Sequence, residues 1–149
     1  MQVVLSILIF GATLFTFTAT SDKITDRAAI ETPRSLDGLN YMQYASYFDH
    51  GQNLNLSEDY RAIRWMQDHV QGSPVIVEAN CPEYRWCSRY TIYTGLPGVV
   101  GWNFHQRQQR AYIANQVEER VAAIGNFYNS IDPVFTRDFI KTYHIKYII

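Results

Sequence analysis

The first stretch of this 149-residue chain is uniformly apolar. Residues 1–21 carry no charged side chain, and VVLSILIFGATLFTFTA is long enough to cross a hydrocarbon core of about 30 Å as a helix. Its short hydroxyl side chains can bond back to helix carbonyls. We therefore expect residues 1–21 to form a transmembrane helix. A secretory signal peptide is the main alternative, although no Lys or Arg precedes the apolar run, and an ordinary buried helix is the other.

Residues 22–56 show neither a helical nor a strand period over any length. Segments such as TPRSLDGLNYM and QYASYFDHGQNLNL predict an irregular connector that lies over a surface. Tyr41, Tyr44 and Tyr47 could instead form a short helical stripe that packs on the domain or lies at a membrane interface.

Helical spacing of apolar residues begins after residue 56. Ser57 is a good N-cap, and one face follows it: Tyr60, Ile63, Met66 and Val70. The next segment, PVIVEA, is short, β-branched and almost wholly apolar, which is typical of a strand covered on both faces. This part of the chain therefore predicts a helix followed by a buried strand.

The remaining pattern predicts two more strands separated by helices. SRYTIYTG indicates a short helix, and LPGVVGW indicates a second buried strand that ends at Trp102. A long amphipathic helix then carries apolar residues at helical spacing: Ile113, Val117, Val121, Ile124 and Tyr128. Asp132 and Pro133 can open a further helix, and the closing IKYII is the third strand.

This order of elements predicts an α/β fold. Right-handed crossovers between the strands would give a small three-layer, mainly parallel-sheet domain over residues 57–149, placed after the N-terminal transmembrane helix and the 22–56 connector. The chain ends on a strand with no helix after it to cover the sheet edge. We therefore expect the domain to be truncated at its C-terminus.

Charge and cysteine content narrow the function classes. Thirteen Lys and Arg against fourteen Asp and Glu give a net charge of -1, so we expect no nucleic-acid partner. Cys81 and Cys87 lie six positions apart and form neither a CxxC motif nor half of a convincing zinc site. They could be reduced thiols, a disulfide if the domain lies outside the cytoplasm, or, least favoured, metal ligands.

Polar and aromatic side chains follow the ends of the first two predicted strands, where open α/β sheets place their ligands. The second of these loops reads GWNFHQRQQR. It offers an aromatic face (Trp102), a proton-transferring imidazole (His105), three amides (Asn103, Gln106 and Gln109) and two cations (Arg107 and Arg110). Such a set suits a sugar or a sugar phosphate. The alternative is a solvated or packed surface, which a Gln- and Arg-rich helix start often provides.

Glu78, at the end of the first predicted strand, could be a buried carboxylate paired with Arg89 or Arg107. Pairing for structure and acid–base work are both open. The chain contains no GxGxxG after this strand, no Walker loop, no GxSxG and no HExxH. The residues alone therefore define no complete catalytic set, and they predict no cofactor or metal site in this chain.

Four segments, TPRSLDGLNYM, AIRWMQDHVQGSPVIVEA, SRYTIYTGLPGVVGWNFHQRQQR and IKYII, resemble the carboxyl-terminal region of the YYY membrane proteins. These large multipass prokaryotic proteins are similar to C-type glycosyltransferases, which use lipid-linked sugar donors. The resemblance implies that the first helix is the last membrane helix of a longer protein and that the domain is extracytoplasmic. It also implies that the catalytic carboxylate lies outside this chain, which would be inactive alone.

By position, the residues that match the family's recurrent motifs, and so are candidates for lining a donor or acceptor cleft, are Asp37, Asn40, Glu78, Arg89, Trp102, His105, Gln106, Arg107 and Arg110. The expected partners are the lipid bilayer, the remaining membrane helices and a lipid-linked sugar. Cys81 and Cys87 do not belong to the family pattern. Lys23, Arg27 and Arg34 would by themselves mildly favour a cytoplasmic domain, but acidic residues are interleaved with them.

Two functions remain open at this point. The first is an accessory domain of a membrane glycosyltransferase. The second is a non-catalytic, membrane-tethered extracytoplasmic binding or assembly module.

Overall fold

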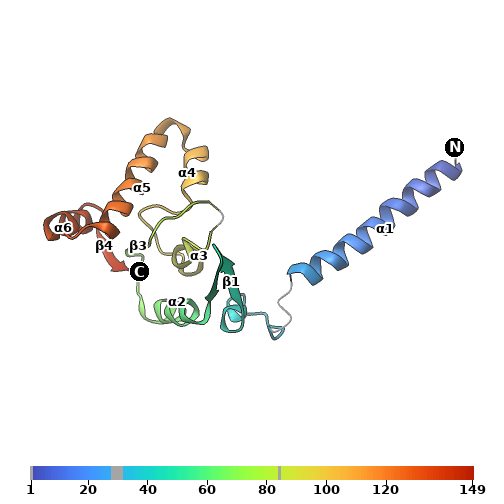
Figure 1. Cartoon of the computed structure of the whole chain (residues 1–149), viewed down its shortest axis with the longest axis horizontal. Helices are drawn as coiled ribbons and strands as arrows, with labels where there is room; N and C mark the ends of the chain where they lie inside the picture. The colour runs from blue at the N-terminus through green and yellow to red at the C-terminus, as the bar shows by residue number, and fades with distance from the viewer. Residues whose placement is uncertain (1, 28–31, 84) are drawn as a thin grey trace.

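The computed structural model describes residues 2–27, 32–83 and 85–149. Its first element is helix α1, Gln2–Arg27, drawn as a single rod apart from the other elements in Figure 1. By length and composition it could cross a membrane, and among the described residues it is the one helix that meets this test. None of its most apolar stretch is buried inside the protein. The helix runs beyond the predicted boundary at residue 21 and includes the first charged residues.

Several threonine hydroxyls within α1 are satisfied by the helix itself. The Oγ1 atoms of Thr13, Thr16 and Thr18 donate to carbonyl oxygens one turn earlier, at 2.8, 2.9 and 3.0 Å. A hydroxyl bonded in this way does not present an unpaired polar group to hydrocarbon. These three threonines of the apolar stretch are therefore compatible with a lipid environment.

The rest of the chain is mixed α/β and mostly helical. The elements are η1 (Asn40–Gln43), β1 (Ser46–Asp49), β2 (Gln52–Asn55), α2 (Ser57–His69), β3 (Val75–Val77), α3 (Arg89–Thr94), α4 (Asn103–Gln109), η2 (Ala111–Ile113), α5 (Ala114–Asn129), α6 (Pro133–Thr142) and β4 (Ile145–Ile148). The described residues form two small sheets, with β1 antiparallel to β2 and β3 parallel to β4.

The segment predicted to be an irregular connector contains ordered structure. β1 and β2 form a hairpin whose turn residues, His50 and Gly51, both have positive φ angles (48° and 79°), as two-residue hairpin turns require. Leu39, Met42 and Leu56, which flank the hairpin, are buried in the core. The Asn- and Gln-rich strand QNLN lacks the residues that usually indicate a strand, and this explains the wrong prediction.

The helices predicted from apolar spacing are confirmed, with changes in detail. In α2, Ile63 and Met66 are buried, but Ser57 is the first helical residue, and its backbone amide is capped by the Asn55 side chain at 2.9 Å. In α6, Asp132 caps the Val134 amide at 2.8 Å and Pro133 opens the helix, as predicted.

The described residues do not confirm the predicted three-stranded parallel sheet. β3 and β4 pair, but the LPGVVGW segment contributes one bridge, between Ile76 and Gly98. In this bridge the Ile76 amide donates to Pro97 O at 2.9 Å, and the Val99 amide donates to Ile76 O at 3.3 Å. Pro97 has no amide hydrogen for a longer ladder, and the chain then turns outward so that Trp102 is 55% exposed.

Two clusters of buried side chains form the core, and β3 contributes to both. Ile76 belongs to the first cluster, which gathers around α2 and α3: Leu39, Met42, Leu56, Ile63, Met66, Ile76, Tyr90 and Leu96. Val77 belongs to the second, which gathers around α5 and α6: Val77, Val99, Val100, Val117, Ile124, Phe127, Phe139 and Ile145. Alternate residues of a strand point to opposite faces, so this short strand joins the two clusters.

Candidate ligand-binding cleft

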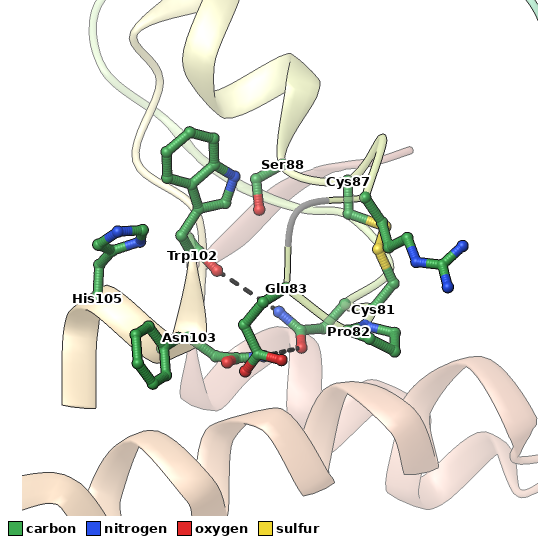
Figure 2. A pocket seen from close by; sticks show the side chains of 12 residues that line it. Cys81, Pro82, Glu83, Cys87, Ser88, Trp102, Asn103 and His105 are labelled. Carbon is green, nitrogen blue, oxygen red and sulfur yellow. Dashed lines mark hydrogen bonds between the residues drawn. A yellow bond between two sulfur atoms is a disulfide. The ribbon is translucent and has the colours of Figure 1, made fainter. Parts of the chain in front are cut away.

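A cleft lies where the chain leaves β3 and where α4 begins. Its walls are the loop after Glu78, which includes Asn80 and Glu83, and the segment Gly101 to His105. Figure 2 shows Trp102 and His105 on one side of the cleft, the Cys81–Cys87 disulfide on the other, and Glu83 between them. The enclosed volume is about 30 Å³, room for about two water molecules, so a larger ligand would insert one edge and lie over the rim.

The loop that forms one wall is fastened at several points. Cys81 and Cys87 form a disulfide, with their Cα atoms 6.1 Å apart. Arg85 pairs with Asp49 of β1, and the Trp86 indole donates to Asp59 of α2 at 2.8 Å. These contacts join the loop to the hairpin and to α2, and so fix the wall of the cleft.

Glu78 has a structural role, one of the two left open by the sequence, but its partners differ from those predicted. Its carboxylate is 5% exposed and accepts three hydrogen bonds at the start of α3, from the amides of Tyr90 (3.3 Å) and Thr91 (3.0 Å) and from the Thr91 hydroxyl (2.5 Å). A carboxylate is favoured at a helix N-terminus, where backbone amides are unpaired. The predicted burial of Glu78 is confirmed, but its predicted ion pair is wrong, because Arg89 pairs with Asp59 and Arg107 with Glu83.

The contact between Glu78 and Thr91 at the start of α3 requires glycine at position 98. A Cβ atom on Gly98 would lie 2.9 Å from Thr91 Oγ1, which is closer than real Cβ contacts allow. That hydroxyl cannot easily move away, since it is bonded to Glu78. The bridge between Ile76 and Gly98 and the start of α3 are thus packed directly against each other.

Arg89 belongs to a second structural network, which joins the loop to α2 and α3. Its Nε lies 2.7 Å from Asp59 Oδ2, and its guanidinium donates to Trp86 O at 3.0 Å. The Tyr90 hydroxyl donates to the other Asp59 oxygen at 3.0 Å. Burial, with a smaller contribution from the negative charge of Asp59, raises the pKa of Tyr90 to about 12. Arg89 is therefore engaged in holding α2, α3 and the loop together.

A chain of polar side chains runs along the cleft. Asn103 Nδ2 donates to Asn80 Oδ1 at 2.9 Å, and Arg107 donates to Asn103 Oδ1 at 3.4 Å and to Glu83 at 3.1 Å. Arg107 also lies 3.7 Å from Glu118 of α5. These contacts orient both amides, so that their remaining donor and acceptor positions have fixed directions.

Aromatic side chains form the rim beside this chain. The Trp102 ring lies 5.4 Å from the His105 ring at an interplanar angle of 37°, and Phe104 meets His105 edge-on at 5.9 Å. Trp102 and Phe104 are both partly exposed. The cleft therefore presents an aromatic surface next to oriented amides and a carboxylate.

The structure brings together three of the nine predicted site residues: Trp102, His105 and, at the edge, Arg107. Gln106 and Arg110 line a different pocket, toward α5.

The two remaining candidates lie in the segment before the hairpin. Asp37 caps the Leu39 amide at 2.9 Å and pairs with Arg64, whereas Asn40 accepts from Gln43 at 2.7 Å. Both are engaged locally, and neither lines the cleft.

Two cleft residues, Asn80 and Glu83, were not identified from the sequence. Their position after a buried strand was the available signal, because ligands in open α/β sheets lie beyond the strand ends. Among the described residues, no group of three or more His, Cys, Asp or Glu side chains is close enough to hold a metal ion. Comparison with protein-family models, curated proteins and solved structures finds no match for this chain.

Proposed function

We propose that this chain is a membrane-anchored extracytoplasmic domain whose cleft binds a sugar, as an accessory part of a membrane glycosyltransferase that uses a lipid-linked donor. The observation that carries the proposal is the exposed Trp102 ring beside the oriented amides of Asn80 and Asn103. A pyranose offers one apolar C–H face to an aromatic ring and neighbouring hydroxyls to amide groups. The small enclosed volume fits one or two hydroxyl groups at the edge of such a ring.

Two further features support a membrane-anchored, extracytoplasmic location of the domain. Helix α1 has 26 residues, which at 1.5 Å per residue gives about 39 Å, enough to cross a bilayer. The disulfide supports an oxidising compartment, because disulfides persist outside the cytoplasm and are rare within it. In the proposed arrangement α1 holds the cleft within reach of lipid-linked ligands.

The finer points of this proposal rest on the resemblance to the YYY membrane proteins. In that setting α1 is the last membrane helix of a longer multipass protein of the prokaryotic plasma membrane. The domain would be part of a three-layer, mainly parallel α/β body, and the catalytic carboxylate would lie in a loop between earlier membrane helices.

Sugar binding can be tested with the full chain in lauryldimethylamine oxide micelles, which carry no sugar headgroup. Saturation-transfer NMR with glucose, galactose, mannose and N-acetylglucosamine should show transfer to at least one sugar. Trp102→Ala should abolish it. Trp65→Ala is the matched control, since Trp65 is also about half exposed but lies on α2, stacked on His69. Equal transfer in wild type and Trp102→Ala, or none to any sugar, would contradict the proposal.

A non-catalytic binding or assembly module, tethered by α1, is the second candidate. It is favoured by one observation: Glu78, the predicted acid–base candidate, is occupied by structural contacts at the start of α3. The coding sequence upstream of Met1 separates the two functions. Further membrane helices in the same reading frame favour the glycosyltransferase, and an in-frame stop codon favours the module.

A further inference from the structure

A second pocket lies between the Gly98–Gly101 segment, the end of α4 and one face of α5. We propose that it is a binding site for a tetrahedral oxyanion of the phosphate class. The pocket shares Gly101 with the cleft but is otherwise lined by different residues. The inference does not depend on sugar binding in the cleft.

The charge of the pocket favours an anion. Arg110 and Arg120 line it together with the neutral amides of Gln106 and Gln116, and no Asp or Glu side chain is among its described lining residues. Two guanidinium groups without a carboxylate repel a cation and attract a multiply charged anion. Arginine also presents paired N–H donors that match phosphate oxygens.

One arginine is held in place. Arg120 donates to Val99 O at 3.3 Å, and its guanidinium lies 5.7 Å from the centre of the Tyr143 ring. One hydrogen bond uses one of its five N–H groups, so donors remain for a ligand. The contacts with Val99 and Tyr143 reduce the entropy that Arg120 would lose on binding.

The other arginine, Arg110, has no side-chain partner among the described residues. Within the described part of the chain, no ion pair, hydrogen bond or ring contact involves the Arg110 side chain, which is exposed at the end of α4. On α5, the Glu118 carboxylate lies 3.7 Å from Arg107. Arg110 is therefore available to close on an anion already bound by Arg120.

The size of the pocket also suits such a ligand. Its volume is about 170 Å³, several times what a single water molecule requires. A tetrahedral oxyanion with part of its hydration shell fits, and Gln106 and Gln116 can donate to its oxygens. A phosphate monoester would have room to extend its organic part into solvent.

The test is a titration of the full chain in detergent micelles with inorganic phosphate at constant ionic strength, followed by amide NMR shifts in the Gly98–Gly101 segment. Arg110→Gln should weaken binding about tenfold or more, because a charge-assisted contact is lost. Arg137→Gln is the matched control, since Arg137 is exposed on α6 and pairs with its neighbour Asp138. Arg120→Gln should also weaken binding, with circular dichroism to check that α5 is intact.

A second arm distinguishes free phosphate from a lipid phosphate. In nanodiscs with and without phosphatidic acid, hydrogen exchange at residues 98–101 should slow with the lipid if the site takes a headgroup. If the lipid slows exchange in wild type but not in Arg110→Gln, and inorganic phosphate does not bind, the ligand is the lipid headgroup. No response to either probe, or equal responses in Arg110→Gln and Arg137→Gln, overturns the proposal.

Discussion

The two sides of α4 use polar side chains in opposite ways. In the cleft, Asn80, Asn103, Arg107 and Glu83 are bonded to one another, so the groups are oriented before any ligand arrives. In the arginine pocket, lined by Arg110 and Arg120, one cation is held and the other has no partner in the described structure. A connected network selects its ligand by geometry, and unpaired cations select their ligand by charge. Single variants can distinguish these two kinds of ligand recognition.

The largest effect should come from Glu78, which supports the cleft side. Glu78→Ala leaves two α3 amides and the Thr91 hydroxyl without their acceptor, and we expect the free energy of unfolding to fall by about 3 kcal/mol. Urea denaturation of the full chain in micelles measures it. Glu119→Ala, on the exposed side of α5, should change it by less than about 0.5 kcal/mol. Similar losses of unfolding free energy in both variants would show that the Glu78 carboxylate contributes little to the stability of the fold.

Removal of the disulfide should impair binding in the cleft and leave binding in the arginine pocket unchanged. The double variant Cys81→Ser, Cys87→Ser opens a short loop, which chain-entropy arguments value at about 2 kcal/mol. We expect sugar transfer in NMR to be lost because the cleft wall is no longer fixed, whereas phosphate binding should be unchanged. Loss of both binding activities would mean that the two sites are not independent.

A smaller change should follow from breaking the amide chain. Asn103→Ala removes the donor to Asn80 and the acceptor for Arg107, at a cost of about 1 kcal/mol in stability. Sugar affinity should fall several-fold, while Asn115→Ala, exposed on α5, should leave it unchanged. Unaltered affinity in Asn103→Ala would assign recognition to the aromatic rim alone.

The smallest effect should be on stability at high pH, through the network of Asp59, Arg89 and Tyr90. The pKa of Tyr90 rises from its ordinary 10.0 to about 12, so its neutral form is favoured in the folded state. Its contribution to stability is complete below pH 10 and is lost as the pH rises toward 12. Stability measured from pH 9 to 12 should therefore decline less in Tyr90→Phe than in wild type. Identical slopes would exclude this linkage.

Apolar spacing predicted α2, α5 and α6 because each buries one face at helical intervals. The hairpin was missed because polar residues fill its second strand, and its turn depends on a positive φ angle at His50, which the sequence pattern does not indicate. LPGVVGW was taken for a full strand because it is apolar, yet it forms a single bridge through Gly98.

Site residues were predictable to the extent that they follow strand ends. Trp102 and His105 lie where the loop after the second apolar run predicted. The role of Glu78 could not be predicted in this way, because its partners are backbone amides of a distant helix rather than an opposite charge. Gln106 and Arg110 are adjacent in sequence to the cleft residues, but they line the pocket toward α5.

The close approach of Gly98 to Thr91 has a consequence for how this protein can change over generations. A methyl group at position 98 would displace the Thr91 hydroxyl from Glu78, so the effects of substitutions at the three positions depend on one another. Gly98→Ala should be tolerated better once Thr91 has become alanine, a non-additivity that a double-mutant cycle would reveal. Positions 78, 91 and 98 should therefore be inherited together, as one coupled unit spread over twenty-one residues of sequence.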